Sequence, residues 1–193
     1  MVYTKDSIGE RGRSLEDEYF RRRDRQLLEQ ARDREAVADH RRQLAAALGI
    51  DDDTIVTALS ALGFDAATGP LVDIVPAIQV AWADGHLSAG EREEIERLLT
   101  PREMQSSGRV GSLLVAGWLA EDPGGEFYRV TMAALRLRLA RLDGDTRTRL
   151  ASRIVDECTA VAKASGGLLG FGALSGAESE RIRALLVALG VES

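Results

Sequence analysis

The sequence contains few of the residues that characterise disulfide-rich, extended or membrane-spanning proteins. Its single cysteine, Cys158, excludes an internal disulfide framework and favours a reducing compartment. Only four of the 193 residues are proline, which argues against an extended, proline-rich chain. The longest stretch without a charged residue, residues 164–177, has 14 residues, whereas a transmembrane helix needs about 20 apolar residues. No apolar run follows the start, as a secretory signal would require. We therefore expect a cytoplasmic protein without a membrane span.

Lysine is also scarce, because 23 of the 25 basic residues are arginine. We attribute this preference to genomic composition rather than to a binding function. Residues 1–43 carry 11 basic and 10 acidic side chains, whereas residues 44–193 carry 14 basic and 21 acidic ones. An acidic main part disfavours contact with a phosphate backbone, so we expect no nucleic-acid partner.

Residues 10–49 have the composition of a long charged helix. They contain no proline between Glu10 and Arg42, and glutamate, arginine, glutamine, leucine and alanine dominate, all of which are good helix formers. A helix that is polar nearly all round cannot bury itself in a core, so it projects into solvent or lies on a partner. We expect a disordered start (residues 1–9) followed by a helical arm (residues 10–49).

An adjacent aromatic pair, Tyr19 and Phe20, stands among the arginines of this arm. Aromatic residues and arginine are the side chains most enriched in interface hot spots. The candidate partner-binding residues are therefore Tyr19, Phe20, Arg21, Arg23 and Leu27. A solvated helix, or a helix that forms a homo-oligomer, is the alternative interpretation of the same pattern.

The run from Gly9 to Leu27, with Glu16-Asp17-Glu18-Tyr19-Phe20-Arg21-Arg22-Arg23 at its centre, resembles the inhibitory segment of the ATP synthase inhibitor proteins. In that family an arginine- and glutamate-rich helix with an adjacent Tyr-Phe pair inserts at a catalytic interface of the rotary ATPase. The resemblance implies a rotary ATPase as a possible partner of the arm. It does not extend to the family's histidine-rich continuation, since only His40 is present there.

Residues 50–193 read as a series of short helices. Several cap and stop residues divide them: Asp51–Asp53 before a first helix, Gly63 at its end, Asp73 as the cap of a second helix, and Thr100–Glu103 as a capping box that starts another. Two further helices are expected at residues 110–119 and 128–142. No alternating β-branched run appears, so we predict an all-α helical bundle with a long N-terminal helical arm.

An internal repeat indicates two related helical hairpins in this bundle. Residues 80–91 match residues 161–178, and both copies read as a helix, a glycine turn and a capped helix. The second copy carries six extra residues in its turn. Repetition of one unit suggests pseudo-symmetric packing of the two hairpins.

The segment Ala81-Trp82-Ala83-Asp84-Gly85-His86-Leu87-Ser88-Ala89-Gly90-Glu91 resembles the tellurite-resistance TerB-like helical family. The resemblance covers roughly residues 70–190 and implies a TerB-like helical domain over residues 50–193. Members of that family are all-helical, and their acidic turn residues are associated with divalent metals. They are linked to stress and phage-defence systems, often as modules of larger assemblies. The second copy departs from the family motif, because Ser165 replaces the aspartate.

The candidate metal ligands are Asp84, His86 and Glu91, since carboxylates and an imidazole suit a divalent ion. Helix capping accounts for the same spacing without a metal. Gly85 can end the first helix, and Ser88 with Glu91 forms a capping box for the second. A divalent ion is thus the one cofactor that the sequence suggests.

The remaining motifs do not indicate an enzyme. The glycine-rich segment 166–172 lacks the basic ending of a phosphate-binding loop, so its Leu168, Leu169 and Phe171 are expected to cover the core or contact a partner. Cys158 lies on an apolar helix face, where a buried, unreactive thiol is expected.

We therefore expect a non-enzymatic, metal-responsive TerB-like interaction module that engages a protein partner through its N-terminal helix. Two alternatives stay open: a regulator of the rotary ATP synthase through the same helix, and a metal-dependent hydrolase that uses Asp84 and Glu91.

Overall fold

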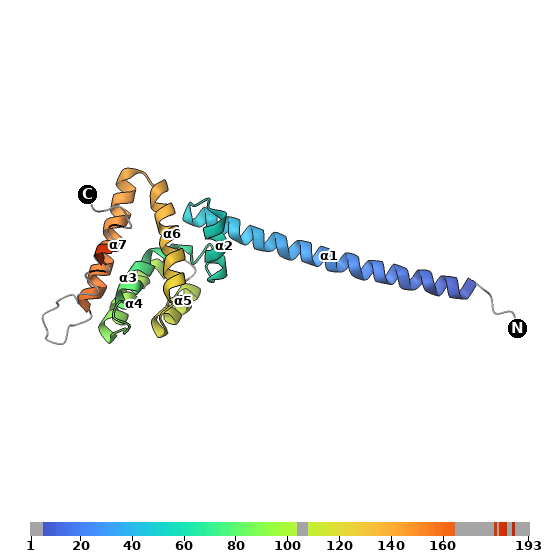
Figure 1. Ribbon diagram of the computed structural model, residues 1–193, viewed down its shortest axis with the longest axis horizontal. Coiled ribbons are helices and arrows are strands. Elements are labelled where there is room, and N and C mark those ends of the chain that lie inside the picture. Colours follow the sequence, from blue (N-terminus) through green and yellow to red (C-terminus); the bar gives the residue numbers. More distant parts are fainter. Residues whose placement is uncertain (1–5, 104–107, 165–179, 181, 185–186, 188–193) are drawn as a thin grey trace. The chain divides into compact units, whose positions relative to one another are not determined.

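The computed structural model describes residues 6–103, 108–164, 180, 182–184 and 187. The chain divides into two compact units, an N-terminal unit (residues 1–40) and a C-terminal unit (residues 41–193). The described residues are helical throughout their regular structure and include no strand (Figure 1). The predicted all-α class is confirmed. No helix in this described part of the chain is both long enough and apolar enough to span a membrane.

The first helix, α1 (Asp6–Leu48), starts four residues before the expected arm. Every described side chain from Tyr19 to His40 is exposed, as expected for a helix that is polar nearly all round. The last turns of α1 differ, because Leu44 and Leu48 are buried in the core of the C-terminal unit. The division between the units therefore falls at residue 40, whereas the expected arm ended at residue 49.

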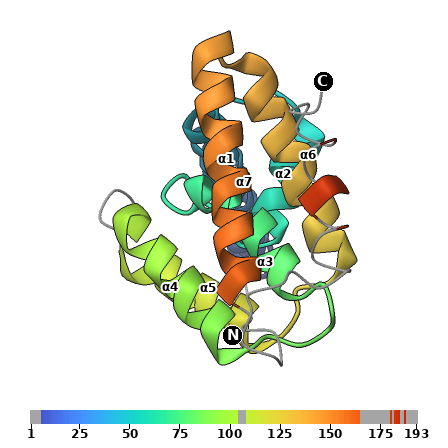
Figure 2. The same cartoon turned by 90° about the vertical axis from the view of Figure 1, so that its left-hand side faces the viewer.

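Six α-helices and one 3-10 helix follow in the described part of the C-terminal unit. They are α2 (Asp53–Ala61), η1 (Gly69–Ile74), α3 (Val75–Ala81), α4 (Ala89–Glu103), α5 (Arg109–Ala120), α6 (Gly125–Arg141) and α7 (Gly144–Ala164). Helix α7 packs against α3 and α4, and α6 packs against α2 and α3 (Figures 1 and 2). The expected helices at residues 110–119 and 128–142 correspond to α5 and α6.

Local capping signals explain where several of these helices begin and end. Asp52 caps α2 by accepting a hydrogen bond from the Ile55 N–H at 3.0 Å, and Gly63 follows α2 with a φ of +88°. The expected helix start at Thr100–Glu103 was wrong, because those residues form the last turn of α4. Ile95 and Leu99 are buried in the core, and this packing stabilises α4 as far as Glu103. Tertiary packing therefore outweighs the tendency of the capping motif to start a new helix.

The centre of the C-terminal unit is a buried aromatic cluster. The ring centroids of Trp118 and Phe127 are 5.0 Å apart, and those of Phe64 and Trp118 are 5.5 Å apart. Aliphatic residues from α1 to α7 surround these rings in one continuous core. Trp82 is half-buried at the edge of this core, and its indole N–H donates to the Trp118 carbonyl at 3.0 Å.

Asp73 does not cap a helix, contrary to the sequence-based expectation. Helix α3 continues directly from η1, so its first turn has no side-chain cap and no need of one. Asp73 lies buried in η1 instead, where its carboxylate accepts hydrogen bonds from Arg138 at 2.8 Å and Arg153 at 3.1 Å. This one carboxylate therefore links η1 to both α6 and α7.

Candidate functional site

The turn between α3 and α4 contains the three residues that the sequence proposed as metal ligands. Helix α3 ends at Ala81 with Trp82 as its C-cap, so the expected helix end at Gly85 lies three residues too late. Gly85 is in the turn with a φ of +80°, and the Asp84 carboxylate accepts the His86 N–H at 2.9 Å. At the start of α4 the Ser88 N–H donates to the Glu91 carboxylate at 2.8 Å, and the Glu91 N–H donates to the Ser88 hydroxyl at 3.2 Å. The predicted capping box is confirmed.

These contacts determine what the turn can do chemically. Asp84 and His86 are exposed, whereas Glu91 is only 3% exposed and already accepts the backbone hydrogen bond of the capping box. Among the residues that the structure describes, no three His, Cys, Asp or Glu side chains gather into a group that could hold a metal ion. The structure thus places Asp84, His86 and Glu91 in one turn without forming a ligand set, and capping explains their spacing.

Close packing fixes the position of this turn. A Cβ atom built on Gly90 would lie 2.1 Å from the carbonyl oxygen of Ala164, at the end of α7. Only glycine allows the start of α4 to approach the α7 backbone this closely. The start of α4, in the first repeat, therefore lies against Ala164, the last residue of α7 and of the first helix in the second repeat.

The second repeat itself is described only in part. Its first helix is the end of α7, where Val161 and Ala162 are buried. Its turn and cap, and with them the apolar loop residues Leu168, Leu169 and Phe171, lie outside the described residues.

The aromatic pair predicted for partner binding lies on the surface of α1. Tyr19 and Phe20 are 58% and 59% exposed, and their rings meet edge to face with centroids 5.8 Å apart. The Arg23 guanidinium donates to the Tyr19 hydroxyl at 3.2 Å, and Leu27 follows one turn later. We call Tyr19, Phe20, Arg23 and Leu27 the aromatic face, because about 100° of rotation per residue places all four on one side of the helix.

Not every predicted contact residue belongs to the aromatic face. Arg21 lies about 200° around the helix from Tyr19, so it points away from this side. Arg22, which the sequence analysis did not select, joins Tyr19, Arg23 and Leu27 around a shallow hollow of about 250 Å³. Because the helix itself was predicted, its rotation of about 100° per residue could already have indicated that Arg22, and not Arg21, lies beside Tyr19.

A groove of about 470 Å³ on the C-terminal unit was not anticipated. Its lining comes from α3, α6 and the segment between α5 and α6, and includes Gln79, Trp82, Asp122, Tyr128, Met132 and Arg136. The Tyr128 hydroxyl donates to the Asp122 carboxylate at 2.8 Å. The i, i+4, i+8 spacing of Tyr128, Met132 and Arg136 could have indicated one shared helix face, but not the opposing surface of α3.

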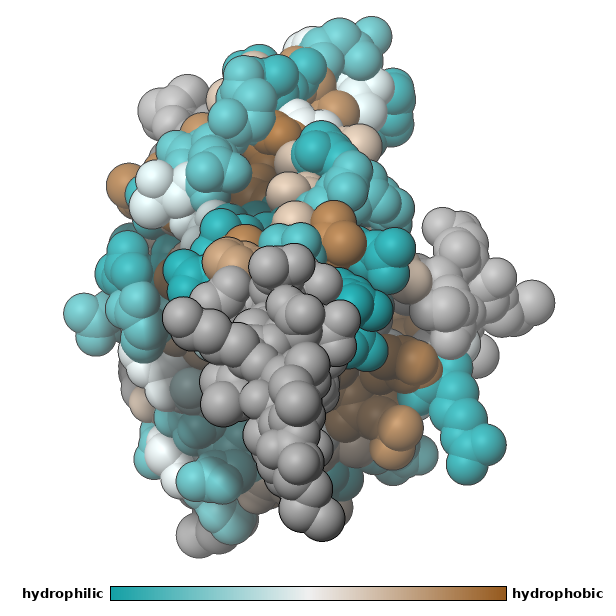
Figure 3. Space-filling model, turned by 90° about the vertical axis from the view of Figure 1, so that its right-hand side faces the viewer, coloured by the Kyte–Doolittle hydropathy of each residue, from teal (hydrophilic) through white to brown (hydrophobic). Residues whose placement is uncertain are grey.

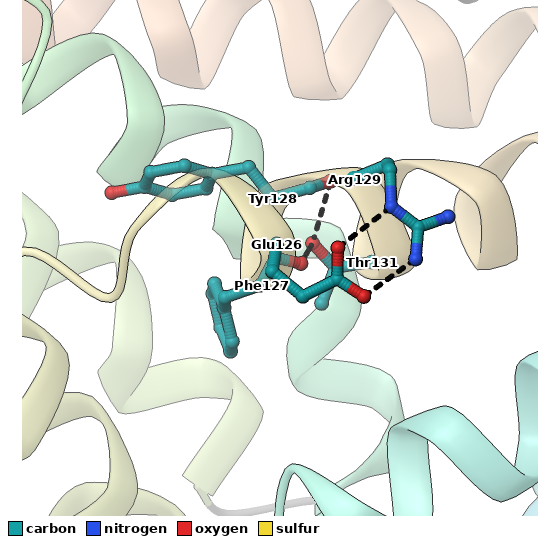
Figure 4. Close-up of polar contacts among 5 residues, drawn as sticks. All are labelled: Glu126, Phe127, Tyr128, Arg129 and Thr131. Carbon is teal, nitrogen blue, oxygen red and sulfur yellow. Dashed lines mark hydrogen bonds and ion pairs between the residues drawn. The ribbon is translucent and has the colours of Figure 1, made fainter.

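Polar contacts within α6 hold the edge of this groove (Figure 4). Arg129 donates to the Glu126 carboxylate, with an Nε–O distance of 2.8 Å, and these hydrogen bonds lower the pKa of Glu126. The Thr131 hydroxyl donates to the Phe127 carbonyl at 2.8 Å. Phe127 and Tyr128 leave the helix in different directions, Phe127 toward the buried aromatic cluster and Tyr128 toward Asp122. Of these residues, Tyr128 and Arg129 line the groove.

The thiol of Cys158 has the properties expected from the sequence. It is 1% exposed, and burial raises its pKa well above the usual value of a thiol. A thiolate is the reactive form of cysteine, so both the burial of Cys158 and the direction of its pKa shift disfavour a role as a nucleophile.

Together these features define an all-α helical bundle with an exposed aromatic face on α1 and a groove on its C-terminal unit. Comparison of the chain with protein-family models, with curated proteins and with solved structures finds no match. The resemblances to the TerB-like family and to the ATP synthase inhibitor proteins therefore remain predictions from the sequence.

Proposed function

We propose that this protein is a non-enzymatic interaction module of the TerB-like type that binds a protein partner through the aromatic face of α1. The observation that carries the proposal is the exposure of Tyr19 and Phe20, which are more than half accessible on a helix whose described side chains up to His40 are all exposed. Two adjacent exposed rings beside arginines have the composition of an interface hot spot.

Burial of the aromatic face would supply the binding energy. An aromatic or leucine side chain gains about 1.5–3 kcal/mol when it is fully buried, so Tyr19, Phe20 and Leu27 together offer several kcal/mol to a partner. The hydroxyl of Tyr19 keeps its hydrogen bond with Arg23 at the edge of the contact. Arg22 and Arg23 favour a partner with acidic groups around an apolar centre, since Arg22 also lines the hollow beside Tyr19.

The sequence of α1 favours a different protein over a second copy of this chain as the occupant. A two-stranded coiled coil needs apolar residues that repeat every three and four positions over several heptads. From Tyr19 onward, where the side chains of α1 are described, the large exposed apolar ones are instead grouped at Tyr19–Phe20 and Leu27–Leu28, with Val37 isolated further along. A homo-oligomer through this helix is therefore the weaker alternative.

A regulator of the rotary ATP synthase is the second candidate function. It is supported by the exposed Tyr19–Phe20 pair within a helix rich in arginine and glutamate, the feature that resembles the inhibitor proteins. A divalent ion at Asp84 and Glu91 does not form part of either proposal, because both carboxylates already accept backbone hydrogen bonds.

The test is a double substitution, Tyr19→Ala with Phe20→Ala, in the full chain. We expect capture of the partner to weaken at least about tenfold, because truncation of hot-spot aromatics costs about 2 kcal/mol or more. Helicity and the melting temperature should stay the same, since alanine is the better helix former and neither ring is buried. Affinity capture followed by mass spectrometry identifies the partner, and isothermal titration measures its affinity.

The matched control is Leu28→Ala. Leu28 is 59% exposed, as Phe20 is, but lies about 125° from the middle of the aromatic face. An equal loss of binding in both variants would contradict the proposal. Titration with purified catalytic subunits of a rotary ATPase tests the second candidate function. Sedimentation equilibrium tests whether the chain self-associates instead.

A further inference from the structure

The junction of α6 and α7 is a basic region on an acidic unit. Residues 136–153 carry six arginines and two aspartates, although residues 44–193 as a whole carry 14 basic and 21 acidic side chains. A local reversal of charge on an acidic protein concentrates positive potential at one place. The sequence therefore concentrates basic side chains at this junction.

A groove of about 390 Å³ lies at this junction. It is lined by Arg138, Leu142, Thr146, Arg149, Leu150 and Arg153. Three guanidinium groups thus surround two leucine side chains, and no carboxylate belongs to the lining. Of these leucines, Leu150 is buried and Leu142 is half-buried, so the groove has an apolar floor.

Asp73 orients two of the three arginines from beneath. Its buried carboxylate accepts one hydrogen bond from Arg138 and one from Arg153, and Glu157 lies 3.9 Å from the Arg153 Nε. Each guanidinium has five N–H donors, and these two hydrogen bonds to Asp73 occupy one donor of each. Two arginine side chains are therefore held in place before any anion arrives.

Arg149 contributes the third positive charge. Its side chain is exposed and donates a hydrogen bond to the Thr146 hydroxyl at 2.8 Å. The Thr146 N–H is already taken by the Asp143 carboxylate at 2.9 Å, so the start of α7 does not offer that amide to an anion. Recognition in this groove would therefore come from the guanidinium groups rather than from the helix terminus.

We propose that this groove binds a small organic anion that consists of a carboxylate or phosphate head and a short aliphatic body. The head lies among Arg149, Arg138 and Arg153, which can each donate hydrogen bonds to its oxygen atoms. The body lies on Leu142 and Leu150, because a head group alone would leave the apolar floor uncovered. This ligand site is separate from the proposed partner contact, since it uses no residue of the aromatic face.

The test is a titration of the full chain, followed by nuclear magnetic resonance of leucine methyl groups and arginine side chains. The probes are hexanoate, hexyl phosphate, inorganic phosphate and hexan-1-ol. Hexanoate or hexyl phosphate should shift the signals of Leu142, Leu150 and Arg149 with an affinity in the roughly millimolar range. Inorganic phosphate should bind more weakly, and neutral hexan-1-ol should not shift the Arg149 signal. Comparison of the two hexyl anions identifies the preferred head group.

The decisive variant is Arg149→Gln, because it removes a charge and leaves both Asp73 ion pairs in place. We expect affinity for the better hexyl anion to fall about five- to tenfold, with partial rescue by Arg149→Lys. Arg136→Gln is the control, since Arg136 is exposed on α6 but lines the other groove.

Four results would overturn the proposal. They are the absence of shifts at Leu142 and Leu150, unchanged affinity in Arg149→Gln, an equal loss in Arg136→Gln, and binding of inorganic phosphate as tight as that of hexyl phosphate.

Discussion

Each of the two units of this protein contains aromatic rings in contact, but in opposite surroundings. In the N-terminal unit, Tyr19 and Phe20 meet edge to face at 5.8 Å and are both more than half exposed. In the C-terminal unit, Phe64, Trp118 and Phe127 pack with centroids 5.0–6.1 Å apart, and each is at most 8% exposed. The centroid distances are similar in the two places, although the α1 rings meet edge to face and the buried rings are tilted or stacked. Burial is therefore the main difference between the two groups of rings.

The difference follows from the number of apolar surfaces that each unit can bring together. Residues 19–40 belong to one helix, whose described side chains have no second apolar surface within their own unit. The C-terminal unit supplies several helices, which cover each other's apolar sides in one core. A side chain therefore contributes to folding only where the chain provides a partner surface, whatever its residue type.

The largest expected effect is a difference in thermal stability between two truncations of α1. Removal of residues 1–40 should leave the melting temperature of the C-terminal unit nearly unchanged, because the described side chains removed are exposed. Removal of residues 1–48 also deletes Leu44 and Leu48, and each buried leucine is worth about 2–5 kcal/mol. That loss approaches the whole stability of a typical domain. Circular dichroism during heating measures the melting temperature of both truncated proteins. Equal melting temperatures would contradict the division at residue 40.

A smaller effect is expected from single aromatic substitutions in the two units. Phe64→Ala should lower the free energy of unfolding by about 3–5 kcal/mol, because Phe64 is fully buried between Trp118 and Phe127. Phe20→Ala should change it by less than about 0.5 kcal/mol, as surface substitutions do. Urea denaturation compares the two variants. A large destabilisation by Phe20→Ala would show that the aromatic face belongs to the folded core.

The smallest effect concerns one methyl group in the C-terminal unit. Gly90→Ala places a Cβ atom 2.1 Å from the Ala164 carbonyl oxygen, so α4 or α7 must shift at a cost of about 1–3 kcal/mol. Gly117→Ala in α5 is the control, because nothing lies within 4 Å of its Cβ position and alanine favours a helix. Urea denaturation should therefore show a loss for Gly90→Ala and no loss for Gly117→Ala. Equal stability of both variants would mean that the α4–α7 contact is looser than described.

Several features that depend on neighbouring residues were predicted from the sequence. The helical class, an N-cap among Asp51–Asp53, the left-handed Gly85 and the capping box of Ser88 with Glu91 all involve hydrogen bonds or dihedral angles within about one turn. The aromatic pair of α1 was found in the same way, since Tyr19 and Phe20 are adjacent in the chain. The burial of Cys158 followed from its place on an apolar helix face.

Features that join distant segments were decided by the tertiary structure alone. Asp73 resembled a helix cap in the sequence, but its partners Arg138 and Arg153 lie 65 and 80 residues away. Glycine is required at position 90 because the backbone of Ala164 lies against it. Leu44, in the last turns of the charged helix, is buried in the core of the C-terminal unit. The basic groove likewise needs α6 and α7 side by side. A sequence specifies local hydrogen bonds through residue type and spacing, whereas contacts across the fold exist only once burial of the core has brought the helices together.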